Sequence, residues 1–207
     1  EVKIVSRYNQ YRAVGKIIQN LREGTTPYEK GGVVWHTQGS GKSLTMVFLI
    51  RKLRSTDDLK DLKIISIVDR IDLEDQLSDT LKYSNESLSI INSRADLKLL
   101  SDDTTDLNLV MMHKFLADNN VSAQSLIDAG IVPKFEKFET INNSDKILLL
   151  IDEAHRTQGG DMGDNLFSAF PNATRIGFTG TPLITERHEI KTHERFGGRL
   201  NEDGEPW

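Results

Sequence analysis

The chain has 207 residues, a formal net charge of −5 and no cysteine. Its hydrophobic fraction of 37% and charged fraction of 28% are typical of a folded domain and exclude a largely disordered chain. The lack of cysteine excludes disulfides and zinc–thiolate sites and fits a cytoplasmic location. The apolar runs are too short to cross a bilayer, so we expect no membrane role. The negative charge means that any DNA contact must be local.

The length and the absence of a linker-like stretch predict one domain over residues 1–207. Its first element is a helix over Tyr11–Leu21, because apolar residues recur there with helical spacing and Gly24 follows. The stretch Arg7-Tyr8-Asn9-Gln10 comes just before it. The amide of Gln10 offers a donor and an acceptor side by side and could bind an adenine edge, although a solvated helix start would have the same composition.

A strand, a glycine turn and a helix are predicted next. The apolar run Gly32–Trp35 is followed by His36-Thr37-Gln38-Gly39-Ser40-Gly41-Lys42-Ser43 and then by an apolar run at residues 44–50. Glycines allow the tight curl that points backbone N–H groups at a phosphate, Lys42 could reach outer phosphates, and Ser43 could hold magnesium. His36 replaces the first consensus glycine, and a plain polar loop remains the alternative.

The middle of the chain continues the strand and helix alternation. Residues 62–68 read as an interior parallel strand, and the helix expected at residues 72–83 carries Arg70 and Gln76 at its start, either as ligand contacts or as exposed polar groups. Residues 88–91 and 107–112 are predicted strands, separated by a short helix at residues 95–100. Residues 117–146 are weakly patterned and are interpreted as a surface insertion.

Two further strands end in polar groups. Residues 147–151 are consecutively apolar and lead into Asp152 and Glu153, which could bind magnesium through water and deprotonate an attacking water, respectively. Residues 173–178 lead into Thr179-Gly180-Thr181, whose hydroxyls could relay hydrogen bonds from a phosphate site. An acidic loop and an ordinary turn are the alternatives. Together the elements predict an α/β fold with a largely parallel sheet, helices on both faces and a ligand at the strands' carboxyl ends.

The set of motifs resembles the first motor domain of superfamily 2 helicases and translocases, a RecA-like P-loop NTPase. Residues 39–43 match motif I, Asp152-Glu153-Ala154-His155 matches motif II, the DEAH box, and Thr179-Gly180-Thr181 matches motif III. Within that superfamily, residues 7–10, 36–43, 68–76 and 152–156 are most similar to the motor subunit of type I restriction enzymes, and His36 is a mark of that subfamily.

The resemblance implies roles for individual residues. ATP would be bound by Arg7 and Gln10 at adenine and by Gln38, Gly39, Ser40, Gly41, Lys42 and Ser43 at the phosphates. Ser43 and Asp152 would hold Mg²⁺, and the catalytic residues would be Lys42, Asp152 and Glu153. DNA contact and coupling of hydrolysis to movement would involve Arg70, Gln76, His155, Thr179 and Thr181.

The implied function is ATP-dependent translocation of double-stranded DNA within a type I restriction complex. The partners would be modification and specificity subunits, together with a second motor domain and a nuclease domain of a longer parent chain. Because such motors hydrolyse ATP between two domains, we expect these residues alone to turn over little ATP. The alternatives are another superfamily 2 helicase of DNA or RNA, and a non-hydrolysing regulatory module, for which Glu153 would have no use.

Overall fold

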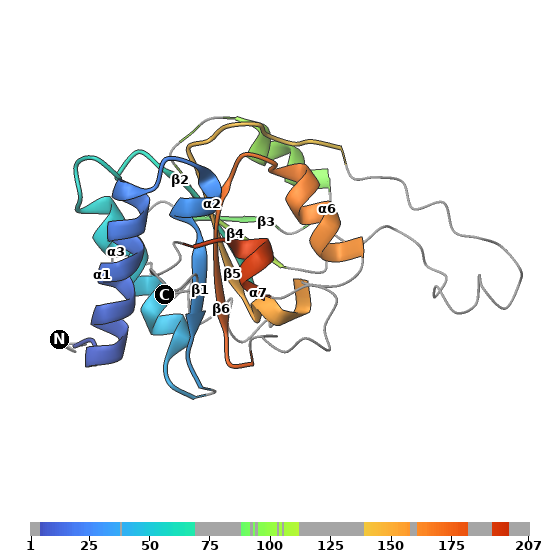
Figure 1. Cartoon of the computed structure of the whole chain (residues 1–207). Coiled ribbons are helices and arrows are strands. Elements are labelled where there is room, and N and C mark those ends of the chain that lie inside the picture. The colour runs from blue at the N-terminus through green and yellow to red at the C-terminus, as the bar shows by residue number, and fades with distance from the viewer. Residues whose placement is uncertain are drawn as a thin grey trace, which may run out of the picture.

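The computed structural model describes residues 5–37, 39–68, 88–91, 93, 95–102, 104, 106–111, 139–157, 161–181 and 192–198. Within them lies one six-stranded sheet with the order β1-β6-β5-β2-β4-β3, and every pair is parallel (Figure 1). The strands are β1 Gly32–Trp35, β2 Lys63–Val68, β3 Leu88–Ile91, β4 Leu107–Met111, β5 Ile147–Asp152 and β6 Thr174–Thr179. Since all six strands run in the same direction, their carboxyl ends lie together at one end of the sheet.

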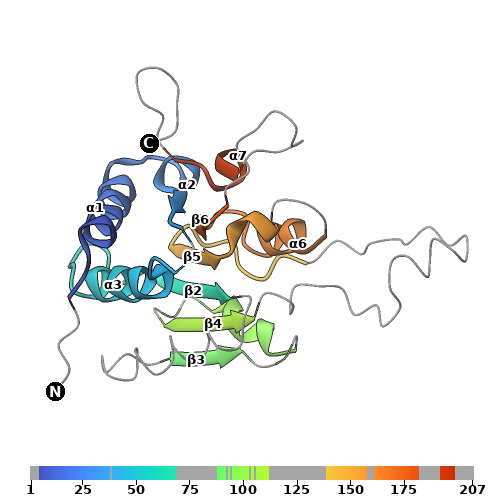
Figure 2. The same cartoon turned by 90° about the horizontal axis from the view of Figure 1, so that it is seen from below.

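Helices cover both faces of the sheet, as the sequence predicts. They are α1 Tyr8–Glu23, α2 Pro27–Lys30, α3 Lys42–Arg54, α6 Asp161–Ala169 and α7 Thr192–Phe196, with 3-10 helices η1 Ala95–Ser101 and η3 Ala154–Thr157. The apolar residues of α1 and α3 share one core cluster with β2, β4, β5 and β6. Those of η1, α6 and α7 share a second with β2, β4 and β5, on the opposite side (Figure 2).

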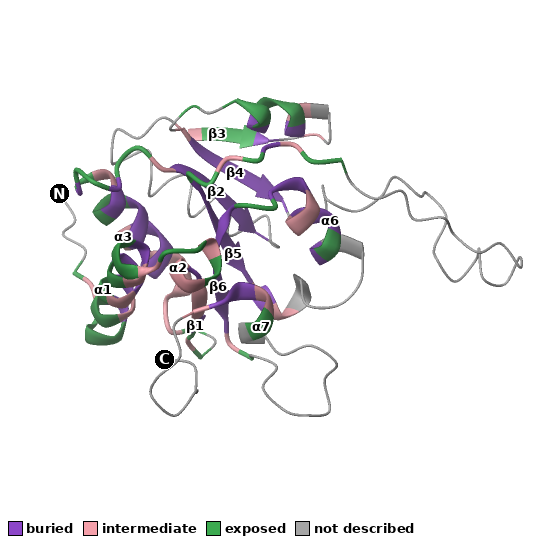
Figure 3. Ribbon diagram, turned by 45° about the horizontal axis from the view of Figure 1, so that its top comes forward, coloured by how far each residue is buried: buried purple, intermediate pink, exposed green. Residues whose placement is uncertain are grey.

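The strands at the centre of the sheet are buried along their whole length. Every residue of β2, β4 and β5 is buried, which explains their nearly continuous apolar sequences. By contrast, β1 lies at a lateral edge of the sheet, and its burial is mixed (Figure 3). Its last residue, Trp35, is exposed. This is the strand that leads into the glycine loop.

The described elements differ from the sequence predictions in a few places. α1 begins at Tyr8, so that Gln10 lies in its first turn, because the backbone N–H of Arg7 donates to Gln10 Oε1 over 2.9 Å. The segment 95–101 is a 3-10 helix. The short helix α2 was not predicted, although it has a readable capping box, in which Thr26 Oγ1 accepts from the N–H of Glu29 over 3.2 Å.

Several predicted features lie outside the described residues, namely Gln38, Arg70, Gln76, the helix at 72–83 and residues 117–138 of the insertion. Residues 139–146 are described and are anchored to the domain: Asn142 is buried, and its amide donates to the carbonyl oxygen of Leu100 over 3.2 Å. In the described part of the chain, no helix is long and apolar enough to cross a membrane.

Candidate functional site

Three loops meet at the carboxyl edge of the sheet. They follow β1, β5 and β6, which are neighbours in the order β1-β6-β5. The pairing of Trp35 with Thr179, and of Asp152 with Phe178, brings the ends of these strands level. Polar groups far apart in sequence are therefore collected at one place, as expected for a ligand site in an open α/β sheet.

The glycine loop has the backbone of an anion site. Gly39 and Gly41 adopt left-handed φ angles of 77° and 85°, which ordinary residues rarely take. Gly41 is the N-cap of α3, so Lys42 and Ser43 lie in the first helical turn, where backbone N–H groups lack helical partners. These N–H groups and the helix dipole favour a phosphate at this end of the helix.

Gln10 links α1 to this loop. Its side chain is 2% exposed, and its Nε2 donates to the carbonyl oxygen of Gly41 over 3.0 Å. A Cβ on residue 41 would lie only 2.7 Å from Nε2, so any residue other than glycine there would force the Gln10 amide to shift. Both ends of the Gln10 amide are thus bonded within the protein, and contact of Gln10 or of the exposed Arg7 with adenine stays a prediction.

The lysine of the loop faces the acidic motif. Lys42 Nζ lies 3.3 Å from Glu153 Oε1, and the two side chains are only 11% and 17% exposed. Glu153 has a φ of 46°, a left-handed conformation that is strained for a residue with a side chain and is typical of functional sites. Asp152, the last residue of β5, is buried beside it. The structure therefore brings together the three residues predicted to be catalytic.

A second contact joins the acidic motif to the end of β6. His155 Nδ1 lies 3.0 Å from the hydroxyl of Thr179 and 3.4 Å from Glu153 Oε2. The Thr179 hydroxyl also accepts from the N–H of Thr181 over 3.1 Å, and Thr179 is fully buried. A continuous chain of polar contacts thus runs from Lys42 through Glu153 and His155 to the turn after β6.

His36 and Ser40 each contribute a buried polar atom to the glycine loop. In the described structure, the buried atoms His36 Nδ1 and Ser40 Oγ have no hydrogen-bond partner. Burial, and secondarily the charge of Lys42, lower the pKa of His36 below its ordinary value, which keeps the ring neutral near pH 7. Buried polar atoms without partners are uncommon and are expected where a ligand completes the hydrogen bonding.

The residues present suit a magnesium–phosphate complex better than an all-protein metal cage. Among the described residues, no group of three or more His, Cys, Asp or Glu could hold a metal. Magnesium commonly takes only one or two protein ligands and completes its shell with phosphate and water oxygens. The hydroxyl of Ser43 and the carboxylate of Asp152 are oxygen donors of the kind that it prefers.

Two supporting residues of the site were missed by sequence reasoning. Thr45 is fully buried, and its hydroxyl donates to the carbonyl oxygen of Gly41 over 3.1 Å, beside the bond from Gln10. Trp35 donates its indole N–H to the carbonyl oxygen of Gly180 over 3.2 Å and so ties the start of one loop to another. A hydroxyl one turn after the glycine was a usable signal for Thr45, but no pattern pointed to the Trp35 contact.

Comparison with known proteins decides the family. The family model described as SWI2/SNF2 ATPase matches residues 9–203. The chain belongs to this family. It is 31% identical over 95% of its length to the type I restriction enzyme HindI endonuclease subunit of Haemophilus influenzae. It is 34% identical over 95% to the putative type I restriction enzyme MjaVIIIP endonuclease subunit of Methanocaldococcus jannaschii. These matches confirm the predicted relationship to the type I restriction subunits.

The SWI2/SNF2-like domain covers 19% and 20% of those two relatives, so the chain spans about a fifth of their length. Among solved structures, the SWI2/SNF2 ATPase core of Sulfolobus solfataricus in complex with double-stranded DNA is similar in fold, with a TM-score of 0.61 and 16% identity. The match covers 94% of the present chain and 36% of the Sulfolobus chain. A nuclease-deletion mutant of the type ISP restriction-modification enzyme LlaGI, in complex with a DNA substrate mimic, is also similar, with a TM-score of 0.51 and 16% identity. That match covers 92% of the present chain and 19% of the LlaGI chain. These likenesses confirm the RecA-like fold.

Proposed function

We propose that this superfamily 2 helicase-like ATPase domain is the ATP-binding half of a motor that moves double-stranded DNA within a type I restriction complex. The observation that carries the proposal is the 3.3 Å contact between Glu153 Oε1 and the Nζ of Lys42, the residue that follows the left-handed Gly41. A cation suited to phosphate and a carboxylate able to activate water lie at one site, and ATP hydrolysis uses both kinds of group.

Each residue of the site has its own proposed role in binding or hydrolysing ATP. The N–H groups of the first turn of α3 and the Lys42 ammonium bind the phosphates of ATP. Ser43 and Asp152 would hold magnesium, which neutralises charge on the phosphate oxygens when it is bound. A triphosphate competes with Glu153 for the Lys42 ammonium, and the carboxylate released from that pair is then available to orient and deprotonate the attacking water.

The contacts of His155 provide a route from hydrolysis to movement. His155 Nδ1 lies near both Glu153 and Thr179, so a shift of the Glu153 carboxylate changes the hydrogen bonding of the turn that follows β6. We assign this turn, with Thr179 and Thr181, to the transmission of the nucleotide state toward DNA. Arg70 and Gln76, outside the described residues, remain the proposed contacts to the DNA backbone.

The names of the relatives and of the solved neighbours support the proposed partners. The curated relatives are named as endonuclease subunits of type I restriction enzymes, and the two solved neighbours are described as bound to DNA or to a DNA substrate mimic. We therefore propose double-stranded DNA as the track, and modification and specificity subunits as partners. A second motor domain and a nuclease domain are proposed in the rest of the parent chain, since relatives are about five times as long.

The test uses the full-length parent protein on linear duplex DNA that carries a third strand as a roadblock. The proposal predicts ATP-dependent displacement of the third strand without separation of the duplex strands, and loss of displacement in the Lys42→Ala variant. Separation of a forked duplex by the parent, without displacement of the third strand, would instead indicate a strand-separating helicase. Nucleotide binding without any turnover would indicate a regulatory module.

A further inference from the structure

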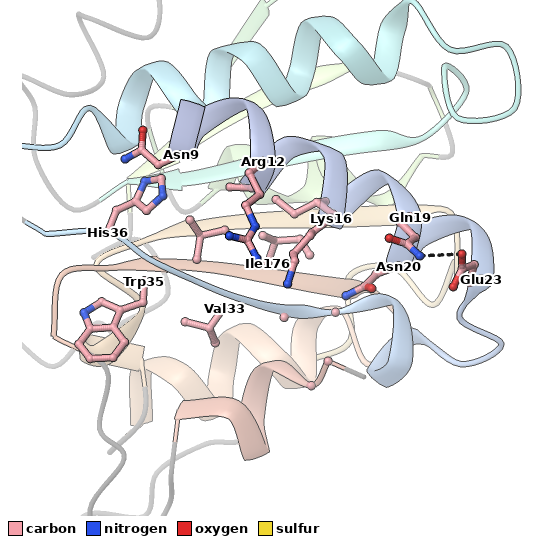
Figure 4. A pocket seen from close by; sticks show the side chains of 17 residues that line it. Asn9, Arg12, Lys16, Gln19, Asn20, Glu23, Val33, Trp35, His36 and Ile176 are labelled. Atoms are coloured by element: carbon pink, nitrogen blue, oxygen red, sulfur yellow. Dashed lines mark hydrogen bonds between the residues drawn. The ribbon is translucent and has the colours of Figure 1, made fainter. Parts of the chain in front are cut away.

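Trp35, the last residue of β1, is a large aromatic residue that is 61% exposed. A groove of about 580 Å³ lies between α1 and β1, and Figure 4 shows the indole of Trp35 on the side of β1 that faces away from α1. Burial therefore does little to hold this ring in place. Its indole N–H instead donates to the carbonyl oxygen of Gly180 over 3.2 Å, although 145 positions separate the two residues.

This bond holds the turn after β6 at its second residue. One residue earlier, the carbonyl oxygen of Thr179 accepts from the N–H of His36 over 3.1 Å. The Thr179 hydroxyl accepts from the N–H of Thr181 over 3.1 Å. Among the contacts described, the Gly180 carbonyl accepts only from Trp35. Residues 35 and 36 thus hold two successive carbonyl groups of the turn.

The same two residues lead directly into the glycine loop. β1 ends at Trp35, and the loop ends at Gly41, the N-cap of α3. Within the loop, the N–H of Ser40 donates to the carbonyl oxygen of Thr37 over 3.1 Å, so the loop is bonded to itself next to His36. Because the loop is short and internally bonded, a displacement of its backbone is passed to residues 35 and 36.

The turn after β6 is therefore held from two sides. On the side of the acidic motif, His155 Nδ1 lies 3.0 Å from the Thr179 hydroxyl. On the side of the glycine loop, Trp35 bonds to Gly180. The two contacts use different side chains and different atoms of the turn, so the loss of one leaves the other in place.

We propose that Trp35 is a positioning residue that carries the state of the glycine loop to the turn after β6, by a route separate from that of Glu153 and His155. When phosphate draws the N–H groups of the loop toward itself, the end of β1 follows, and the indole N–H takes the Gly180 carbonyl with it. This inference rests on the proposed function, because it gives Trp35 a part in coupling ATP turnover to DNA.

The first test follows the indole N–H of Trp35 by NMR in the chain. The sequence has two tryptophans, so the Trp207→Phe variant has a single indole signal. The bond to Gly180 predicts that this N–H exchanges at least about tenfold more slowly than a free indole, and that its signal shifts when Mg·ADP binds. Exchange at the free rate, or an unchanged signal at saturating Mg·ADP, would overturn the inference. Failure of Mg·ADP to bind, measured by calorimetry, would overturn the proposed function on which it rests.

The second test measures ATP turnover by the full-length parent with and without duplex DNA. Trp35→Phe keeps an aromatic ring but removes the N–H donor, and the loss of one neutral hydrogen bond corresponds to a factor of about three to ten. We expect the stimulation by DNA to fall by that factor, while the basal rate and the KM for ATP change by less than about twofold. Unchanged stimulation would overturn the inference.

A variant of matched shape separates the donor from the ring. Replacement of Trp35 by 3-benzothienylalanine puts sulfur in place of the indole N–H in a ring of the same shape. Its stimulation by DNA should fall as far as that of Trp35→Phe, because both lack the donor to Gly180. Stimulation equal to that of the wild type would show that only the shape of the ring matters, and would overturn the inference.

A double variant tests whether the route is separate. In a parent that carries Thr179→Val and so lacks the hydroxyl beside His155, Trp35→Phe should lower the stimulation by a further factor of about three or more. A smaller further loss would place Trp35 and Thr179 on one route and overturn the separation. A wild-type parent without DNA stimulation would overturn the proposed function, whereas full stimulation in the Trp35 variants would overturn this inference alone.

Discussion

The amide of Gln10 meets the carbonyl oxygen of Gly41 at 3.0 Å, although 31 positions separate the two residues in the chain. This bond fixes the first turn of α1 against the glycine loop. The hydroxyl and the N–H of Thr45 donate to the same carbonyl oxygen, over 3.1 and 3.0 Å. Gln10 therefore has a positioning role that does not depend on contact with adenine.

The Gln10→Ala variant separates these two roles. If Gln10 acts by positioning the loop, the variant should weaken ADP and inorganic tripolyphosphate alike, each by about tenfold, which corresponds to about 1.4 kcal/mol. The measurement is calorimetric titration of both ligands in the presence of magnesium. Weakening of ADP alone would show that recognition of the base dominates. Gln19→Ala is the control, because Gln19 lies on the same helix and bonds only to Glu23 among the contacts described.

Gly39→Ala and Gly41→Ala are a matched pair of variants, whose free energies of unfolding can be compared. Gly39→Ala should cost about 1–2 kcal/mol of unfolding free energy, because its φ is 77° but a Cβ there has no neighbour within 4 Å. Gly41→Ala should cost about 0.5–1.5 kcal/mol more, because Gln10 Nε2 would lie 2.7 Å from its Cβ and would have to shift away from the carbonyl oxygen to which it donates. Urea unfolding of both variants measures the difference. Adding Gln10→Ala to Gly41→Ala should recover part of the extra loss, and strict additivity would contradict the collision.

The Thr179 hydroxyl should contribute to stability and to coupling. Thr179→Val keeps the shape of the side chain but leaves the N–H of Thr181 and His155 Nδ1 without this partner, so we expect a loss of about 1–3 kcal/mol in urea unfolding. In the parent protein, stimulation of ATP turnover by DNA should fall by a larger factor than the basal rate. Thr179→Ser retains the hydroxyl and should keep most of the stimulation. Equal stimulation in the wild type and the valine variant would remove Thr179 from the coupling route.

The lowered pKa of His36 makes stability depend on pH in one direction. Below the ordinary value of 6.5, the unfolded chain takes up a proton that the folded chain accepts only at lower pH. The contribution of neutral His36 is thus complete above pH 6.5 and is lost as the pH falls toward the folded pKa. The unfolding free energy of wild type, measured between pH 7.5 and 5, should therefore fall more steeply than that of His36→Asn. Parallel curves would contradict the lowered pKa.

The fold was largely readable because its strands follow simple rules. Buried parallel strands such as Ile147–Asp152 are almost entirely apolar. The glycine loop predicts where α3 begins. The sequence could not show contacts between distant segments, nor which residues adopt an unfavourable backbone conformation. The Gln10 amide has the donor and acceptor that adenine would need, but in the structure its Nε2 donates to the carbonyl oxygen of Gly41, 31 residues away. Likewise, nothing local marks Glu153 as left-handed, since that φ is held by the surrounding contacts.

The short helices were also hard to predict, for a different reason. α2 and α7 have four and five residues, too few to show a helical period. Only the capping pair of Thr26 and Glu29 signalled the first of them. The groove beside β1 depends on which strand lies at the sheet edge, and strand order is a property of topology that the individual strand sequences do not carry.

We propose that the loop around Lys42 binds the phosphates of ATP with magnesium. The most direct measurement is isothermal titration of Mg·ADP into the wild-type chain and its Lys42→Ala variant, with a Glu153→Gln variant beside them. We predict binding by wild type, a loss of about 30-fold or more in Lys42→Ala, and retained or tighter binding in Glu153→Gln, whose neutral side chain competes less for Lys42. Equal affinity of wild type and Lys42→Ala would contradict the assignment of the site.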